Sequence, residues 1–211
     1  MKTIIVNGSP RKNWNTAQLL KEAKKGAESV GAEVEYVDLA DLKFSGCRSC
    51  LACKRAGVEE PCKCYWKDDL APLLEIICAA DKLIVGAPIY FGEPSGIFRC
   101  FVERLFFILL TYNGLSSQFK GKIDVDVFLT MNVDDDFYRE NYEAKMRDYF
   151  APMGLLNGQT RIFPVCDTLQ VDDYSKYEMG GFSEEHKKAK READFPAALN
   201  QAFNVGAGTC S

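Results

Sequence analysis

The chain of 211 residues contains a single histidine and no excess of positive charge. His186 lies in the charged run 184–188, which predicts a solvated helix surface. Serine or cysteine catalysis that depends on a neighbouring histidine is therefore disfavoured. The formal net charge is −4, which supplies neither the basic footprint of a nucleic-acid-binding protein nor a polybasic membrane anchor. We expect no nucleic acid and no membrane among its partners.

Long apolar runs are also absent from the sequence. The most apolar run covers residues 106–110, whereas a transmembrane helix needs roughly 18 apolar residues. The amino-terminal segment becomes polar at Asn7, so it lacks the apolar core of a signal peptide. We therefore expect a cytoplasmic protein.

Strand-like and helix-like segments alternate along the whole chain. Short runs of apolar and β-branched residues predict strands at 3–6, 33–38, 82–86, 123–130 and 161–165. Helical periodicity and terminal signals predict helices at 16–30, 68–80, 95–109, 138–153 and 183–205. This alternation predicts one α/β domain over residues 1–211, with a doubly wound parallel sheet of five strands. A cysteine-rich insertion at about 44–66 follows the second strand.

Two loops of unusual composition follow the first and third predicted strands. In a doubly wound sheet, ligands bind outside the carboxyl ends of the strands, where the strand order reverses. For the flavodoxin-like order 2-1-3-4-5, that point lies between strands one and three. The loops at 7–17 and 87–94 are therefore the candidate ligand-binding segments.

The first of these loops has the chemistry of a phosphate site. The amides of residues 15–18 stand at the predicted start of a helix, where the helix dipole favours an anion. The loop matches neither the dinucleotide nor the triphosphate glycine pattern, which favours a mononucleotide. In the alternative interpretation, Asn15 or Thr16 only caps the helix. The side chains that offer hydrogen-bond donors or positive charge are Ser9, Arg11, Asn13, Asn15 and Thr16.

The second loop carries two aromatic residues beside a glycine. Tyr90 and Phe91 can flank a flat flavin ring, and Gly92 permits a close approach of the backbone. In the alternative interpretation, the aromatic side chains only seal the end of the sheet. Because a phosphate loop stands on the neighbouring strand, we favour flavin mononucleotide, FMN. The candidate flavin-binding residues are Pro88, Ile89, Tyr90, Phe91 and Gly92.

Residues 8–16 and 87–96, together with the pattern around Phe195 and Pro196, resemble the family of NAD(P)H-dependent FMN reductases and iron–sulfur flavoproteins. The resemblance implies a flavodoxin-like fold, NAD(P)H as co-substrate and a homodimer or dimer of dimers. Trp14 departs from the pattern, since the family often has glycine there. By the same resemblance, the FMN phosphate is held by Ser9, Arg11, Asn15, Thr16 and Ala17.

Five of the nine cysteines lie in one segment, between Cys47 and Cys64. The spacing of Cys47, Cys50 and Cys53 is typical of iron–sulfur ligation rather than of a single zinc ion. It resembles the 4Fe–4S motif of iron–sulfur flavoproteins. Two residues compete as the fourth ligand: Cys62 suits the spacing of the motif, and Cys64 suits the distance to residues 67–69.

Not every member of the resembling family binds a cluster, and cluster-free reductases keep several of these cysteines. The scattered cysteines are expected to be small buried apolar residues. They are Cys78, Cys100, Cys166 and Cys210.

The leading hypothesis is a redox flavoprotein that passes electrons between NAD(P)H or a ferredoxin-type partner, FMN and a 4Fe–4S cluster. Because the cofactors carry such chemistry, no side chain is assigned a catalytic role. One alternative is a cluster-free flavin or quinone reductase. Another is a flavin electron carrier without catalytic activity. The broad apolar face of the helix at 95–109 also favours a homodimer.

Overall fold

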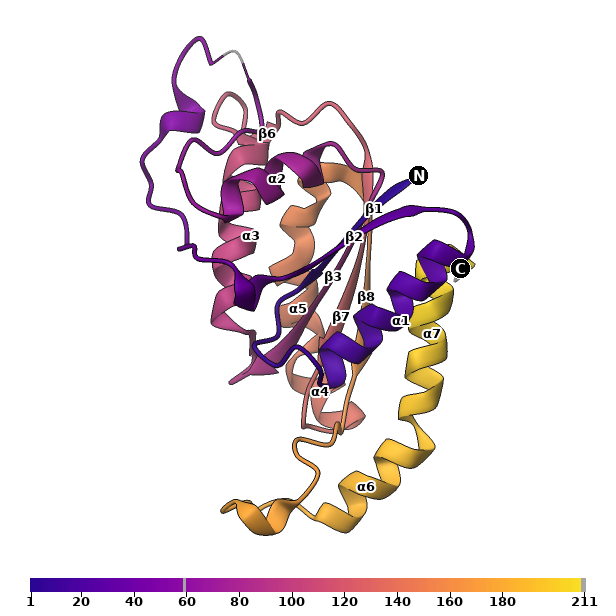
Figure 1. The fold of residues 1–211 in the computed structure, drawn as a ribbon. Helices are drawn as coiled ribbons and strands as arrows, with labels where there is room; N and C mark the ends of the chain where they lie inside the picture. Colours follow the sequence, from indigo (N-terminus) through magenta and orange to yellow (C-terminus); the bar gives the residue numbers. More distant parts are fainter. Residues whose placement is uncertain (59, 210–211) are drawn as a thin grey trace.

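The protein is described by a computed structural model that covers residues 1–58 and 60–209. Five parallel strands form its central sheet in the order β2-β1-β3-β7-β8, which confirms the predicted flavodoxin-like topology (Figure 1). A short strand, β4 (Glu93–Pro94), pairs antiparallel with β3, and β5 (Leu110–Thr111) pairs with β6 (Ser116–Ser117). The parallel strands are β1 (Lys2–Asn7), β2 (Glu33–Asp38), β3 (Lys82–Tyr90), β7 (Ile123–Thr130) and β8 (Asn157–Val165).

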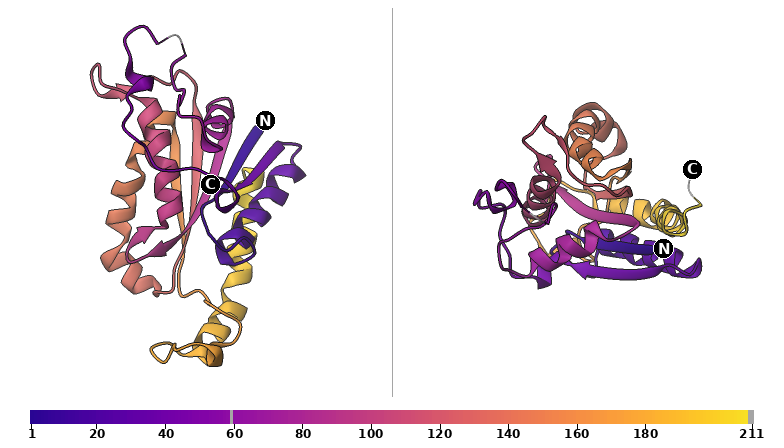
Figure 2. Two further views of the ribbon diagram at one scale, coloured as in Figure 1. Left: turned by 60° about the vertical axis from the view of Figure 1, so that its left-hand side comes forward. Right: turned by 90° about the horizontal axis from the view of Figure 1, so that it is seen from above.

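Helices cover both faces of this sheet (Figure 2). On one face lie α1 (Asn15–Ser29) and α7 (Phe195–Ala207). The other face is covered by α2 (Leu70–Cys78), α3 (Gly96–Leu109) and α5 (Glu143–Phe150). Within the described ranges, no helix is long and apolar enough to cross a membrane.

The central strands supply both hydrophobic cores. In β1, Ile4 and Val6 pack into the core beneath α2 and α3, while Ile5 packs into the core beneath α1 and α7. All three side chains are fully buried. Successive side chains of a strand point to opposite faces, so a strand covered on both faces needs apolar residues at every position. This is why β1 and β3 have no polar alternation in the sequence.

Three predicted elements differ in their boundaries. The third strand continues to Tyr90, so most of the expected loop at 87–94 is strand β3 and its antiparallel return β4. The helix expected at 138–153 is divided into α4 (Asp135–Asn141), α5 and a 3-10 turn, η3 (Ala151–Leu156). Pro152 at the start of that turn has no N–H to continue an α-helix.

The helix expected at 183–205 is also divided. Its parts are α6 (Glu184–Ala193) and α7, which meet at Asp194. Pro196 lies in the first turn of α7, where its missing N–H costs no hydrogen bond. As a result, α6 extends past the carboxyl ends of the strands, at the bottom of Figure 1.

Two glycines allow α1 and α7 to pack in close contact. A Cβ atom on Gly26 would lie 2.0 Å from the carbonyl oxygen of Phe203, and one on Gly206 would lie 1.9 Å from that of Ala23. Real Cβ atoms do not approach backbone oxygens so closely. The separation between the two helices is therefore set by the absence of side chains at these positions.

We expect the substitution Gly26→Ala to lower the free energy of unfolding by about 3 kcal/mol, because the new methyl group must push α7 away from α1. Urea denaturation followed by circular dichroism measures this change. Gly154→Ala is the matched control, since no described atom outside its own turn lies within 4 Å of its Cβ position. Equal stability of both variants and the unaltered protein would show that the helices are not packed this closely.

Candidate functional site

A cleft lies at the carboxyl ends of β1, β3, β7 and β8. It is formed where the loop after β1 meets the end of β3, which are the two segments selected from the sequence. Their adjacency follows from the pairing of β1 with β3 in one parallel register. The predicted residues that line the cleft are Ser9, Arg11, Asn15, Thr16, Pro88, Ile89 and Tyr90.

Four predicted residues have their side chains elsewhere. Asn13 accepts a hydrogen bond from Lys21 Nζ at 2.6 Å, and Ala17 is fully buried in α1. Phe91 is fully exposed at the turn between β3 and β4. The Cα of Gly92 faces the ring of Tyr142, since a Cβ there would lie 3.0 Å from that ring. Their contribution to binding remains a prediction.

The part of the cleft that β7 and β8 supply was not predicted from the sequence. Thr16 Oγ1 lies 2.7 Å from Thr130 Oγ1 at the end of β7, so the start of α1 is bonded directly to that strand. The signal was available in principle, because the carboxyl ends of all parallel strands meet at one edge of the sheet. The additional lining residues are Trp14, Thr130, Met131, Asn132, Thr168 and Gln170.

The amino terminus of α1 forms one wall of the cleft. Trp14 occupies the capping position, and in the described part of the chain its side chain makes no capping hydrogen bond. Asn15 and Thr16 lie inside the first turn, so neither acts as the cap. The first amides of a helix have no intrahelical acceptor, and the helix dipole makes this end partly positive. The arrangement suits an anion such as a phosphate monoester.

Hydrogen bonds within the loop hold it in a fixed shape. The amide of Ser9 donates to Asn7 Oδ1 at 3.0 Å, and Asn7 Nδ2 donates to Asp38 Oδ1 at 2.6 Å. The amide of Arg11 donates to Ser9 Oγ at 3.1 Å. The loop is therefore anchored to the ends of both β1 and β2 without any ligand contact.

Trp14 has a structural role in the cleft. Its Nε1 donates to the carbonyl oxygen of Leu169 at 3.0 Å, and Asn15 Nδ2 donates to the same oxygen at 2.8 Å. The guanidinium of Arg11 lies 4.3 Å from the centre of the indole ring and donates to the carbonyl oxygen of Gln170 at 2.6 Å. These contacts fasten the phosphate loop to the segment that follows β8.

Two buried oxygens in the cleft walls lack partners. Asn132 Oδ1 and Gln170 Oε1 are inaccessible to solvent and have no hydrogen-bond partner among the described residues. A buried acceptor without a donor costs free energy, about 1 to 3 kcal/mol. A ligand that brings N–H or O–H groups into the cleft would remove that cost. A flavin ring and its ribityl chain carry such groups, so the residues present fit FMN.

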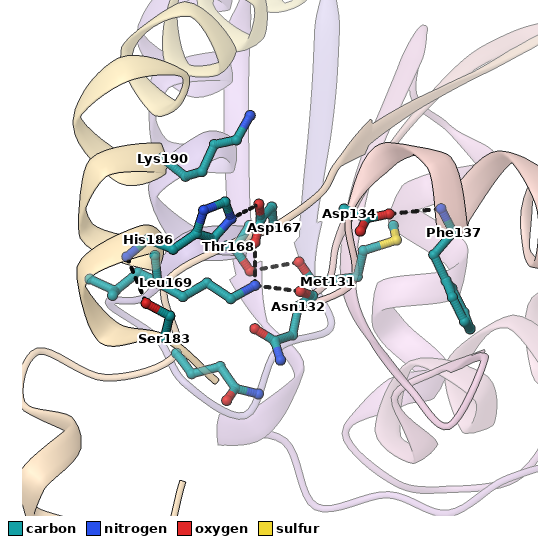
Figure 3. Close-up of polar contacts among 12 residues, drawn as sticks. Met131, Asn132, Asp134, Phe137, Asp167, Thr168, Leu169, Ser183, His186 and Lys190 are labelled. Carbon is teal, nitrogen blue, oxygen red and sulfur yellow. Dashed lines mark hydrogen bonds and ion pairs between the residues drawn. The ribbon is translucent and has the colours of Figure 1, made fainter. Parts of the chain in front are cut away.

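A buried carboxylate ties α6 to the walls of the cleft (Figure 3). Asp167 Oδ2 lies 2.6 Å from His186 Nε2, and its Oδ1 accepts a hydrogen bond from Lys187 Nζ. Lys187 Nζ also donates to the carbonyl oxygen of Asn132 at 2.5 Å. His186 lies on the exposed surface of helix α6, as expected from the sequence, and it also contacts Asp167, which is 19 residues away.

The charge state of Asp167 is set by these partners. Burial alone would raise its pKa, but the hydrogen bonds and charges of Lys187 and His186 outweigh burial and lower the pKa below the ordinary value of 3.8. Asp167 also has a φ of 52°, which is rare for a residue with a side chain. The chain thus keeps an unusual backbone conformation at the point where the carboxylate meets α6.

A second cavity contains four of the five clustered cysteines. Cys47, Cys50, Cys53 and Cys64 line it together with apolar side chains that include Trp66 and Phe107. Cys62 lies outside this cavity. It is buried, and its carbonyl oxygen accepts a weak hydrogen bond from Cys78 Sγ at 3.9 Å. Cys210 is outside the described residues.

The cavity places Cys64 beside a buried cation. Arg104 Nη2 donates to Cys64 Sγ at 3.1 Å, and Arg104 Nη1 lies 2.5 Å from Asp68 Oδ2. Burial opposes the charge of Arg104, but these contacts raise its pKa. Burial also raises the pKa of Cys53; the charge of Lys54 opposes this, and the nearby Cys64 thiol adds to it.

The cysteine cavity has suitable donors but not a formed metal site. Over residues 1–58 and 60–209, no three or more His, Cys, Asp or Glu side chains are arranged so that they could hold a metal ion. The donor set itself, four thiols around an apolar wall, is the type that iron–sulfur clusters use.

The chain matches one family model and several curated proteins. The family model described as "NADPH-dependent FMN reductase" matches residues 1–130. Among curated proteins, an iron-sulfur flavoprotein of Methanocaldococcus jannaschii is 36% identical over 104 residues, which are 49% of this chain and 51% of that protein. An iron-sulfur flavoprotein of Archaeoglobus fulgidus is 35% identical over 104 residues, 49% of this chain and 48% of that protein. The chain thus spans about half the length of the curated relatives it matches.

Solved structures resemble the whole chain in fold. An NAD(P)H:quinone oxidoreductase from Methanothermobacter marburgensis superposes with a TM-score of 0.74 at 15% identity and covers 98% of both chains. An FMN-dependent NADH-azoreductase from Bacillus anthracis, solved in complex with FMN, gives a TM-score of 0.64 at 13% identity and covers 100% of both chains. At such low identity, these structures show the fold alone.

We expect Asp167→Asn to lower the free energy of unfolding by about 2 kcal/mol at pH 7, because the buried Lys187 ammonium loses its counter-charge. The pKa of Asp167 is lowered in the folded protein. The stability that its carboxylate contributes is therefore present above the ordinary pKa of 3.8 and is lost as the pH falls through the lowered pKa. The difference from the unaltered protein should therefore shrink in strongly acidic solution.

Urea denaturation between pH 7 and pH 3 measures this difference. Asp136→Asn, which removes a largely exposed partner of Arg139, is the control and should change stability little at any pH. If Asp167→Asn lowered the free energy of unfolding by the same amount at every pH, the stabilisation by Asp167 would not come from its charge.

Proposed function

The chain belongs to the NADPH-dependent FMN reductase family, and on this premise we propose that it is a flavin oxidoreductase whose cleft binds FMN. The observation that carries the proposal is one cleft with an uncapped helix terminus and two unpartnered buried acceptors, Asn132 Oδ1 and Gln170 Oε1. The helix terminus is suited to an anion. The two acceptors are suited to the donor groups of a ring and a polyol chain. FMN combines both.

Each wall of the cleft has its own task in this proposal. Ser9, Asn15 and Thr16 bind the phosphate together with the first amides of α1. Pro88, Ile89 and Tyr90 form the surface against which the ring lies. When bound, FMN supplies hydride and single-electron chemistry, so the side chains bind and orient rather than react. NAD(P)H is the proposed source of electrons.

A 4Fe–4S cluster bound by Cys47, Cys50, Cys53 and Cys64 is the second part of the proposal. Support comes from the shared cavity of these four thiols and from the iron-sulfur flavoproteins among the relatives. The Arg104 guanidinium beside Cys64 would stabilise a thiolate there. A ferredoxin-type protein is a proposed electron partner, and a homodimer or dimer of dimers is the proposed assembly.

A cluster-free flavin or quinone reductase is the alternative function. One observation favours it: in the described part of the chain, the cysteine side chains are not arranged to hold a metal ion. In that case the cysteine-rich insertion would be a structural cover over α3.

We expect the purified apoprotein to bind FMN. Asn15→Asp should weaken this binding at least about tenfold, because the new carboxylate repels the phosphate and forms an ion pair with Arg191 instead of it. Quenching of flavin fluorescence measures both affinities. Asn13→Asp adds the same charge to the same loop outside the cleft and should weaken binding much less. Equal losses in the two variants would contradict the placement of the phosphate beside Asn15.

We expect the protein reconstituted without oxygen to hold about four iron atoms per chain. Cys64→Ser should lower the iron content and the broad absorbance near the flavin bands, whereas Cys62→Ser, a matched change outside the cavity, should keep both. Iron and acid-labile sulfide analysis measure these contents. Less than one iron per chain in the unaltered protein would favour the cluster-free reductase, and the reverse order of the two variants would make Cys62 the fourth ligand.

A further inference from the structure

Arg191 on α6 is a cation that, within residues 1–58 and 60–209, forms no ion pair with a carboxylate. Its Nη1 donates to Asn15 Oδ1, and its Nη2 donates to Gln18 Oε1 at 2.5 Å. The guanidinium lies 3.5 Å from the centre of the Phe195 ring. Burial lowers the pKa of Arg191, and Asp172 opposes this only by a long-range charge. Both direct acceptors are neutral amides of α1.

This position is electrostatically unfavourable in the absence of an anion. Asn15 is the first residue of α1, and the amino terminus of a helix carries a partial positive charge of roughly half a unit. A cation stabilises the opposite end of a helix and is repelled here. An arginine held against this end, half-buried and without a carboxylate, therefore points to a negative charge supplied from outside the chain.

The contact with Asn15 also determines which way its amide faces. Arginine can only donate hydrogen bonds, so the atom of Asn15 that faces Arg191 must be the oxygen. The amide nitrogen is then turned to the other side, where one hydrogen bonds to the carbonyl oxygen of Leu169 at 2.8 Å. The second hydrogen is left for an acceptor. Without Arg191, the amide could rotate and present its oxygen, which repels a phosphate.

The contact with Gln18 fixes the end of the loop, directly before α1. Gln18 Nε2 donates to the carbonyl oxygen of Asn13 at 3.0 Å, while its Oε1 accepts from Arg191. Through these two amides, one guanidinium orients both Asn15 and the backbone before it. The planar fork of arginine suits this double contact, and the single ammonium of lysine does not.

We propose that Arg191 is a positioning residue that makes the cleft selective for the phosphorylated flavin over riboflavin. It adds positive charge at the phosphate end of α1 and holds the Asn15 amide with its N–H groups available. The proposal rests on the proposed function, namely that the cleft binds FMN. It adds α6, a helix outside the cleft lining, to the machinery that distinguishes the two flavins.

The test compares the affinities of the apoprotein for FMN and for riboflavin, which differ only in the phosphate. In Arg191→Gln, FMN affinity should fall about tenfold, which corresponds to about 1.4 kcal/mol, with riboflavin affinity nearly unchanged. Arg191→Lys keeps the charge but loses the fork, so its ratio of affinities should be intermediate. Lys188→Gln removes one positive charge from the exposed side of the same helix and should leave the ratio unchanged.

Each outcome decides one question. An unaltered apoprotein that binds neither flavin contradicts the proposed function itself. If that protein prefers FMN but Arg191→Gln keeps the same ratio, or loses both flavins by the same factor, the role of Arg191 is overturned. If Arg191→Gln does not fold, as judged by near-ultraviolet circular dichroism, Arg191→Lys decides, and a ratio equal to that of the unaltered protein overturns the proposal.

Discussion

The carbonyl oxygen of Leu169 joins the two halves of the cleft. It accepts hydrogen bonds from Trp14 and Asn15 on one side, and it belongs to the segment that continues from β8 on the other. β1 and β8 are not neighbours in the sheet, so no ladder of backbone hydrogen bonds connects them. The shape of the cleft therefore depends on side-chain contacts: those with this acceptor, the hydrogen bond from Arg11 to the carbonyl oxygen of Gln170, and the hydrogen bond between Thr16 and Thr130. Because these contacts use side chains of the phosphate loop, the protein itself holds the loop in shape, which lowers the entropy cost of binding.

Buried carboxylates hold the strands that supply this segment. Asp126 on β7 lies 3.0 Å from Lys82 Nζ on β3 and 2.7 Å from Arg161 Nε on β8, so three adjacent strands share one ionic contact. Asp167 makes a similar contact with Lys187 on α6. A buried charge is tolerated when its partners and hydrogen bonds are complete, and removing one partner is costly. Such pairs add little net stability, but they define one arrangement of β8 and α6, which is the arrangement that forms the cleft.

The two candidate sites lie at opposite ends of α3. Ser95, directly before the helix, donates through its Oγ to the carbonyl oxygen of Gly8 in the phosphate loop at 2.6 Å. Phe107, near the other end, lines the cysteine cavity. Phe107 follows Ser95 by twelve positions, which corresponds to a rise of about 18 Å along the helix. The cysteine-rich insertion packs against this distant end, as Figure 1 shows at the upper left, so the fold can keep the cleft while the insertion varies.

The topology, the two segments that meet at the switch point and the clustering of the cysteines could be predicted from the sequence, although most of the second segment proved to be strand rather than loop. Strand periodicity, helix signals and cysteine spacing are local properties, and they are readable wherever neighbours along the chain are neighbours in space. The tertiary structure decided which members of each motif face a common cavity. Asn15 lines the cleft as the first residue of α1, whereas Asn13 precedes the helix and its Oδ1 accepts a hydrogen bond from Lys21. Likewise Cys64 lines the cysteine cavity, whereas Cys62, with a φ of 64°, contacts Cys78 through its carbonyl oxygen.

The contacts of His186 and Arg191 could not be predicted from the sequence. Their partners Asp167 and Asn15 are 19 and 176 residues away, and only the packing of α6 past the end of the sheet brings these charges together.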